Sequence, residues 1–182
     1  IVALMNRSGG SAGFAKWAQK HVKSRVGTEL ATFALGILIF IDDYFNCLTV
    51  GSVMKPVTDK HKVSREKLAY LIDATAAPVC IIAPISSWAA AVAGFARGAG
   101  AESGISLFIQ AIPYNFYSLL TIVFIIAITL MSFDYGSMKI HELNAIENND
   151  LYTCGDKNES VNVVPSSKGI VADLIVPIVI LI

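Results

Sequence analysis

The sequence has little charge, few cysteines and few histidines, and each shortage excludes a class of protein. Charged residues make up 15% of the 182 residues, against about 25% in a typical soluble domain. The 14 basic and 14 acidic residues cancel, so nothing in the net charge points to nucleic acid. The three cysteines and three histidines show no zinc-ligand spacing, and no nucleophile is paired with a base. We therefore expect no enzyme, no cofactor and no nucleic-acid partner.

Apolar residues, by contrast, are abundant. They make up 54% of the chain, and the mean hydropathy is +0.61. This composition predicts an all-α, polytopic membrane protein with the lipid bilayer around it. The chain begins at Ile1 and stops at Ile182 inside an apolar run, so we expect an internal fragment that packs against the remainder of the same polypeptide. Assembly as a homodimer is left open.

Hydropathy and charge divide this single transmembrane domain into alternating loops and apolar segments. In chain order we expect a basic loop after a preceding helix (1–26), a re-entrant hairpin (27–54), a basic loop (55–67), a broken helix (68–96), a transmembrane helix (105–133), a polar loop (134–169) and the start of the next helix (170–182). The polar loop has room for a short helix near residues 138–147.

The hairpin prediction rests on basic residues at both ends of segment 27–54. These are Arg7, Lys16, Lys20, Lys23 and Arg25 before it, and Lys55, Lys60, Lys62, Arg65 and Lys67 after it. Positive residues favour the cytoplasmic side, so a simple span would leave one cluster on the wrong face. Residues 27–41 as a helix are also only about 22 Å long, short of the ~30 Å hydrocarbon core. A chain that turns near residues 42–46 and leaves on the side it entered removes the conflict.

Two prolines interrupt the second apolar segment. Pro78 and Pro84 each remove a backbone donor and disfavour helix just before them. We expect a half-helix from residue 68 to about 76, an irregular stretch to Pro84 and a second half-helix over 86–95. The backbone groups freed by such a break can bind ions. A proline-kinked structural span is the alternative.

Three aspartates lie where the bilayer is expected. Asp42 and Asp43 follow an apolar run, and Asp73 lies in the broken helix. A carboxylate at bilayer depth costs about 2.5–3.5 kcal/mol, so it needs a cation, a proton or a water-filled cavity. Burial raises the pKa of a carboxyl group and a neighbouring carboxylate raises it further, so Na⁺ and H⁺ can compete for one site. Alternatively, Asp42 or Asp43 caps the next helix and Asp73 is an interhelical hydrogen-bond partner.

Neutral oxygens near these aspartates complete the candidate cation site. The predicted ion-binding residues are Asp42, Asp43, Asn46, Thr49, Asp73, Thr75, Ser86 and Ser87, with the three aspartates as direct ligands of the transported Na⁺. The neutral members could instead join helices through hydrogen bonds. We expect Trp88 to pack against other side chains, and Glu29 to lie solvated near the membrane interface.

Four short stretches carry a family resemblance. Residues 39–46 (IFIDDYFN), 49–59 (TVGSVMKPVTD), 72–80 (IDATAAPVC) and 86–88 (SSW) resemble the NhaC-type sodium/proton antiporter family of the ion transporter superfamily, over residues 1–94. The resemblance implies a secondary active antiporter of the cell (cytoplasmic) membrane that exchanges Na⁺ for H⁺, with its cation site at the hairpin tip and helix break. Related members imply an alternative, an exchanger of organic anions or amino acids coupled to Na⁺ or H⁺. A membrane scaffold or receptor is the alternative outside transport.

Overall fold

The protein folds into helices joined by short turns. The structure, a computed structural model, describes residues 7–100, 103–153, 169–173 and 176, and within these ranges it contains no strand. The all-α prediction is confirmed for this part of the chain. The elements are α2 (Gly10–His21), α3 (Arg25–Leu38), α4 (Asp43–Lys60), α5 (Arg65–Ile82), α6 (Ser87–Gly98), α7 (Gly104–Ala111), the 3₁₀ helix η1 (Ile112–Tyr114), α8 (Phe116–Met131) and α9 (Gly136–Glu147).

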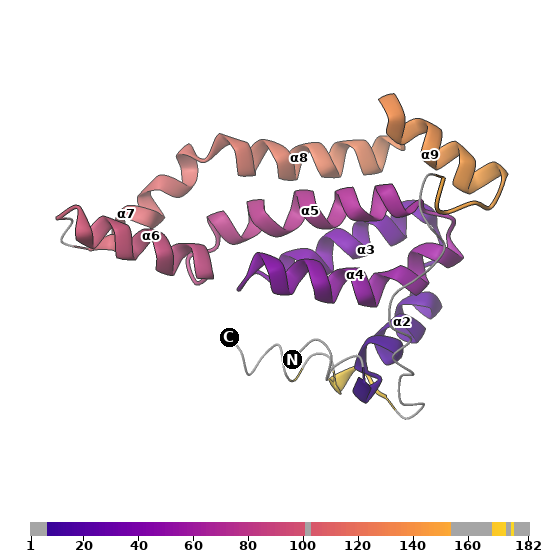
Figure 1. Ribbon diagram of the computed structural model, residues 1–182, viewed down its shortest axis with the longest axis horizontal. Helices are drawn as coiled ribbons and strands as arrows, with labels where there is room; N and C mark the ends of the chain where they lie inside the picture. The colour runs from indigo at the N-terminus through magenta and orange to yellow at the C-terminus, as the bar shows by residue number, and fades with distance from the viewer. Residues whose placement is uncertain (1–6, 101–102, 154–168, 174–175, 177–182) are drawn as a thin grey trace.

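Helix α5 is the centre of the arrangement. Helices α3, α4, α5 and α8 run side by side along the long axis, α6 and α7 pair beyond one end, and α9 lies at the other end (Figure 1). Helix α5 contacts α3, α4, α6, α8 and α9. One apolar core joins α2, α3, α4 and α5, and a second joins α3, α5 and α8 around Phe33, Leu71 and Ile125. Every site described below therefore borders α5.

Helices α3 and α4 form a helical hairpin. Helix α3 is capped by Ser24, whose Oγ accepts a hydrogen bond from the backbone N–H of Gly27 at 3.0 Å, and the chain turns between Leu38 and Asp43. The outer ends of both helices meet Glu142 of α9, which contacts Arg25 at the start of α3 and Ser64 just beyond α4. The two arms are therefore antiparallel, and the tip lies at the end of the bundle away from α9.

Gly36 allows the hairpin to approach α5 closely. A Cβ atom on this residue would lie 2.7 Å from Cγ2 of Thr75 and 3.7 Å from Oδ1 of Asn46. The first distance is below the normal limit for a Cβ contact, so any larger residue would push α3 away from α5. The absence of a side chain at Gly36 thus allows α3, α4 and α5 to pack closely beside the candidate site.

The break in the second apolar segment comes later than the sequence predicts. We expected the first half-helix to end near residue 76, but α5 continues through Pro78 to Ile82. A proline inside a packed helix removes one hydrogen bond, and neighbouring helices can compensate for that loss without ending the helix. The break covers residues 83–86, which include Pro84, and α6 leaves it at 44° to α5.

The predicted transmembrane helix over 105–133 is also divided. Helix α7, η1 and α8 follow one another, with Pro113 inside η1. Asn115 caps α8, because its Oδ1 accepts a hydrogen bond from the backbone N–H of Ser118 at 3.3 Å. The proline and this cap together explain why the helix restarts at Phe116.

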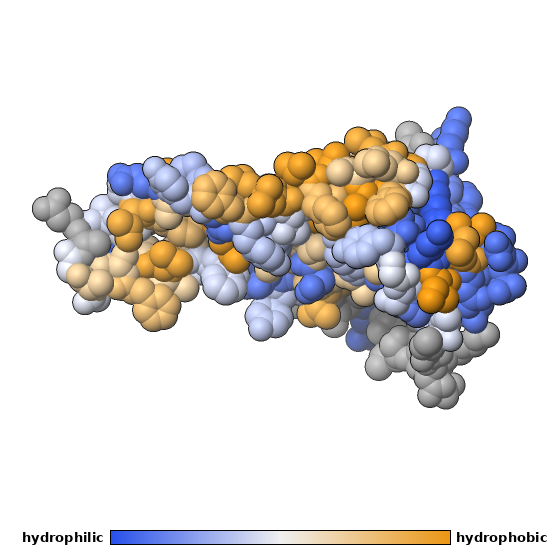
Figure 2. Space-filling view, turned by 90° about the horizontal axis from the view of Figure 1, so that it is seen from above, coloured by the Kyte–Doolittle hydropathy of each residue, from blue (hydrophilic) through white to orange (hydrophobic). Residues whose placement is uncertain are grey.

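Helix α8 presents a hydrophobic surface. Figure 2 shows this surface along α8, bordered by hydrophilic residues at the end where α9 lies. Among the described residues, the helical stretch Phe116–Glu147 is long and apolar enough to cross a membrane, and the bent pair of α5 and α6 passes the same test when taken together. The exposed large side chains on α8 are Phe116, Tyr117, Leu119, Leu120, Val123, Phe124, Leu130 and Met131.

Two segments that we expected to be loops contain helices. Helix α2 lies within the predicted basic loop 1–26 and buries Ala18 in the core against α4. Helix α9 lies within the predicted polar loop, close to the short helix expected there. The predicted start of a helix over 170–182 lies largely outside the described residues.

Candidate cation site at the hairpin tip

The hairpin tip and the helix break are in direct contact. The backbone N–H of Ser87 donates a hydrogen bond to the carbonyl of Ile41 at 2.8 Å. The indole Nε1 of Trp88 donates to Oδ2 of Asp43 at 3.2 Å. The two motifs, far apart in the sequence, thus meet in space, and Trp88, which we expected to pack against other side chains, is 41% exposed and makes this polar contact.

Four helix ends converge at this contact. Helices α3 and α5 end here, and α4 and α6 begin here. A helix carries partial negative charge at its C-terminal carbonyls and partial positive charge at its N-terminal amides. The region therefore offers carbonyl oxygens to a cation and N–H groups to carboxylates.

The two neighbouring aspartates occupy the start of α4. Asp42 is the N-cap, and its Oδ1 accepts a hydrogen bond from the backbone N–H of Phe45 at 2.9 Å. Asp43 lies in the first turn, where its Oδ1 accepts from the N–H of Tyr44 at 3.0 Å. Both side chains are half-buried, and the positive end of α4 stabilises their charge. The capping role that we considered as an alternative thus applies to Asp42.

Asp73 stands apart from this pair. Its side chain is exposed on α5. Cys47 on α4 lies near enough to Asp42, Asp43 and Asp73 to interact with their charges. Across the part of the chain that the structure describes, no three His, Cys, Asp or Glu side chains gather closely enough to hold a metal ion. A cation at this tip would therefore rely on neutral oxygens as well as carboxylates.

Asn46 supplies the most distinctive of these oxygens. It is fully buried, and its Nδ2 donates to the carbonyls of Gly36 at 2.7 Å and Ile39 at 2.9 Å. These bonds satisfy two carbonyls at the end of α3 and fix the orientation of the amide. Its Oδ1 has no hydrogen-bond partner among the described residues.

Thr49 follows one turn along the same face of α4. It is 1% exposed, and its Oγ1 also lacks a hydrogen-bond partner within the described part of the chain. A buried polar atom left unsatisfied costs about 1–3 kcal/mol. Two such oxygens on one helix face, near the hairpin tip, indicate a place for a bound cation or water.

The three remaining candidates have different surroundings. Thr75 is buried beside Gly36, and its Oγ1 donates to the carbonyl of Leu71 at 2.6 Å. Ser86 is the N-cap of α6; its Oγ accepts from the N–H of Ala89 at 3.1 Å and donates to the carbonyl of Cys80 at 2.7 Å. The side chain of Ser87 is exposed. Thr75 therefore borders the Asn46 oxygen, whereas Ser86 and the backbone of Ser87 shape the break.

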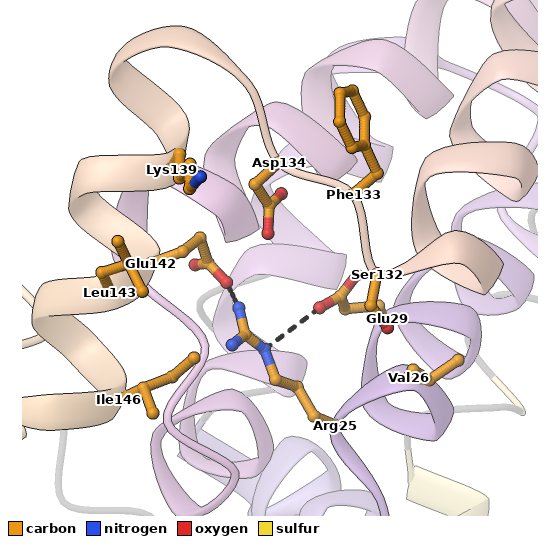
Figure 3. A pocket seen from close by; sticks show the side chains of 10 residues that line it. All are labelled: Arg25, Val26, Glu29, Ser132, Phe133, Asp134, Lys139, Glu142, Leu143 and Ile146. Atoms are coloured by element: carbon orange, nitrogen blue, oxygen red, sulfur yellow. Dashed lines mark ion pairs between the residues drawn. The ribbon is translucent and has the colours of Figure 1, made fainter.

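The opposite end of the bundle contains a charged cluster that sequence reasoning missed. It comprises Arg25, Glu29, Lys67, Asp134 and Glu142, and a cavity of about 360 Å³ borders it (Figure 3). The expectation that Glu29 is solvated is wrong: it is 5% exposed, because Arg25 and Lys67 pack against its carboxylate. The i,i+4 spacing of Arg25 and Glu29 is the one sequence feature that could have indicated part of this cluster.

Comparison with known proteins gives the family. Residues 79–182 match the profile of the Na⁺/H⁺ antiporter family. A protein of Haemophilus influenzae, described only as uncharacterized, is 39% identical over 188 aligned residues, which cover all of this chain and 35% of that relative. The chain thus spans about a third of the length of this relative. No solved structure matches.

Apolar helices with a hairpin tip in contact with a helix break resemble the arrangement found in ion-transport proteins. The chain belongs to the Na⁺/H⁺ antiporter family, a family of membrane transporters rather than enzymes. The profile match begins at Val79, beyond most of the motifs that carried the resemblance, so it supports the family and leaves the NhaC-type subdivision as a prediction.

Proposed function

We propose that the full-length protein exchanges Na⁺ for H⁺ across the cytoplasmic membrane by secondary active transport. The observation that carries this proposal is the pair of buried, unpartnered oxygens of Asn46 and Thr49, close to the contact between tip and break. The family membership supports ion exchange in general. The identity of the exchanged ions as Na⁺ and H⁺, and the direction in which each moves, are part of our proposal.

In this mechanism, neutral oxygens and a carboxylate bind the ion together. The oxygens of Asn46, Thr49 and Thr75 replace part of the hydration shell of Na⁺, and an aspartate at the tip supplies the negative charge. A carboxyl group that binds a proton loses that charge, so Na⁺ and H⁺ occupy the site in turn. Convergence of ligands from α4, α5 and the break lets a movement between these elements release the ion.

Loss of transport in aspartate variants tests this proposal. Asp42→Asn, Asp43→Asn and Asp73→Asn each preserve side-chain shape but remove a titrating group. We expect at least one of them to lower Na⁺-dependent proton flux in everted vesicles by at least about tenfold, the effect of losing about 1.4 kcal/mol of binding free energy. The full-length protein is used, and its membrane insertion is measured in parallel.

Glu147→Gln, an exposed change on α9, is the matched control and should transport like the unmodified protein. Wild-type flux in all three aspartate variants would refute a carboxylate role. Flux that depends on an added organic anion or amino acid, and not on Na⁺ and H⁺ alone, would instead identify the related exchanger.

The hairpin also makes a topological prediction. Its two outer ends both reach Glu142, so we expect the hairpin to enter and leave the bilayer on the cytoplasmic side, where the flanking basic residues favour placement. Single cysteines placed at Lys23 and Lys60 in the full-length protein should react with an impermeant maleimide from the cytoplasmic side only. Labelling of the two positions from opposite sides would restore a simple membrane span.

A further inference from the structure

Charged side chains from four segments are buried together at the base of the hairpin. Arg25 and Glu29 come from α3, Lys67 from α5, Asp134 from the turn before α9, and Glu142 from α9. The side chains of Lys67, Glu29 and Glu142 are only 2%, 6% and 3% exposed. None of these residues belongs to the candidate cation site at the other end of α5.

The charges form a continuous chain of ion pairs. Arg25 lies between Glu142, which it contacts directly, and Glu29, at 3.4 Å from Nε to Oε1. Lys67 lies between Glu29, at 3.9 Å from Nζ to Oε2, and Asp134, which it contacts directly. Figure 3 shows Arg25 between the carboxylates of Glu142 and Glu29.

Glu142 also binds the backbone on the far side of the hairpin. Its Oε1 accepts a hydrogen bond from the N–H of Ser64 at 2.9 Å. Nearby, Nζ of Lys62 donates to the carbonyl of Ile146 at 3.4 Å, and the N–H of Arg65 donates to the carbonyl of Leu151 at 3.1 Å. One carboxylate on α9 thus joins the start of α3 to the turn between α4 and α5.

Stability alone is a weak reason for this arrangement, because the desolvation of buried ion pairs offsets most of their attraction. The pairs instead fix the position of α9, because they hold it to both ends of the hairpin. The adjoining cavity, lined by Val26, Leu143 and Ile146 among others, gives the charged groups room to separate and become hydrated. The hairpin base can move relative to α9 only if these pairs open.

We propose that this cluster is an ionic clasp that holds the hairpin base against α9, and that its opening accompanies transport. Glu142 is the principal positioning residue, because it alone among the five binds both ends of the hairpin. The clasp contacts no residue of the candidate cation site, so it acts on the rate of movement and not on the affinity for Na⁺. The link to transport rests on the proposed function.

Hydrogen–deuterium exchange on the purified full-length protein tests the clasp without any transport assay. In Glu142→Gln, the amides of residues 25–29 and 64–67 should exchange about tenfold faster or more, because Arg25 keeps Glu29 alone and the ion pair that joins α3 to α9 is lost. Glu147→Gln, on the same helix but exposed, should leave exchange unchanged. Asp134→Asn should give the same pattern more weakly, since Glu142 still binds both ends of the hairpin, and it serves if the first variant fails to fold.

Transport kinetics then test the consequence. Glu142→Gln should change kcat while the KM for Na⁺ stays within about twofold, since the cation ligands are untouched. Unchanged exchange in both variants, or an equal change in KM and kcat, would overturn the clasp. If the unmodified protein exchanges no Na⁺ for H⁺, the proposed function fails, whereas the exchange data still decide whether the clasp exists.

Discussion

Replacement of Asn46 by alanine is expected to lower both the stability of the protein and its affinity for Na⁺. The change leaves the carbonyls of Gly36 and Ile39 without their donors and opens space in the core. We expect a loss of about 2–4 kcal/mol in the free energy of unfolding. If Oδ1 is a ligand, the Na⁺ affinity should also fall by at least tenfold, about 1.4 kcal/mol. Thermal unfolding and Na⁺ titration of the full-length protein measure the two effects.

Thr49→Val separates the binding role from the structural one. It exchanges the unpartnered hydroxyl for a methyl group of similar size, so stability should be unchanged or greater, whereas Na⁺ affinity should fall. Asn148→Ala, an exposed change at the C-cap of α9, is the control for replacing an asparagine by alanine in Asn46→Ala. Wild-type Na⁺ affinity in both Asn46→Ala and Thr49→Val would show that these oxygens serve structure alone.

Removal of the buried lysine should have the larger effect on stability. Lys67→Met leaves the carboxylates of Glu29 and Asp134 without the lysine that they share. Breaking a buried ion pair from one side typically costs about 3–5 kcal/mol. We therefore expect a fall of that size in the free energy of unfolding, measured for the full-length protein in lipid nanodiscs.

Lys139→Met is the matched control, because Lys139 borders the same cavity but is exposed. Further replacement of Glu29 by Gln and Asp134 by Asn in the Lys67→Met background should recover much of the loss, since no buried charge then lacks a partner. A loss in Lys67→Met no larger than in Lys139→Met would show that the lysine is hydrated in the folded protein.

The sequence was most informative where a local rule applied. Basic residues on both sides of segment 27–54 predicted a reversal of the chain, and the structure has one between Leu38 and Asp43. Two adjacent aspartates after an apolar run marked the tip, although the turn covers residues 39–42 and precedes the predicted 42–46, because Asp42 caps α4. Pro84 marked the break. Pro78 misled, because the propensity of a proline to end a helix was outweighed by the packing of α5 among its neighbours.

Contacts between distant residues could not be derived in this way. Nothing in the sequence pairs Glu142 with Arg25 or Lys67 with Asp134, because each pairing depends on where α9 lies after α8. The contact of Trp88 with Asp43 depends in the same way on the 44° bend between α5 and α6. Asn46 was chosen as a source of oxygen, yet its amide donors proved equally important, since they hold the end of α3.

The continuity of α5 has a mechanical consequence. Lys67 and Thr75 lie on one uninterrupted stretch of helix, separated by about 12 Å of rise and ahead of Pro78. A hydrogen-bonded helix of that length behaves as a rigid rod, so Lys67 and Thr75 keep the same separation whenever α5 moves as one body. The ion pairs of the clasp can therefore open and close at one end of this stretch without altering the geometry of the helix around the threonine hydroxyl.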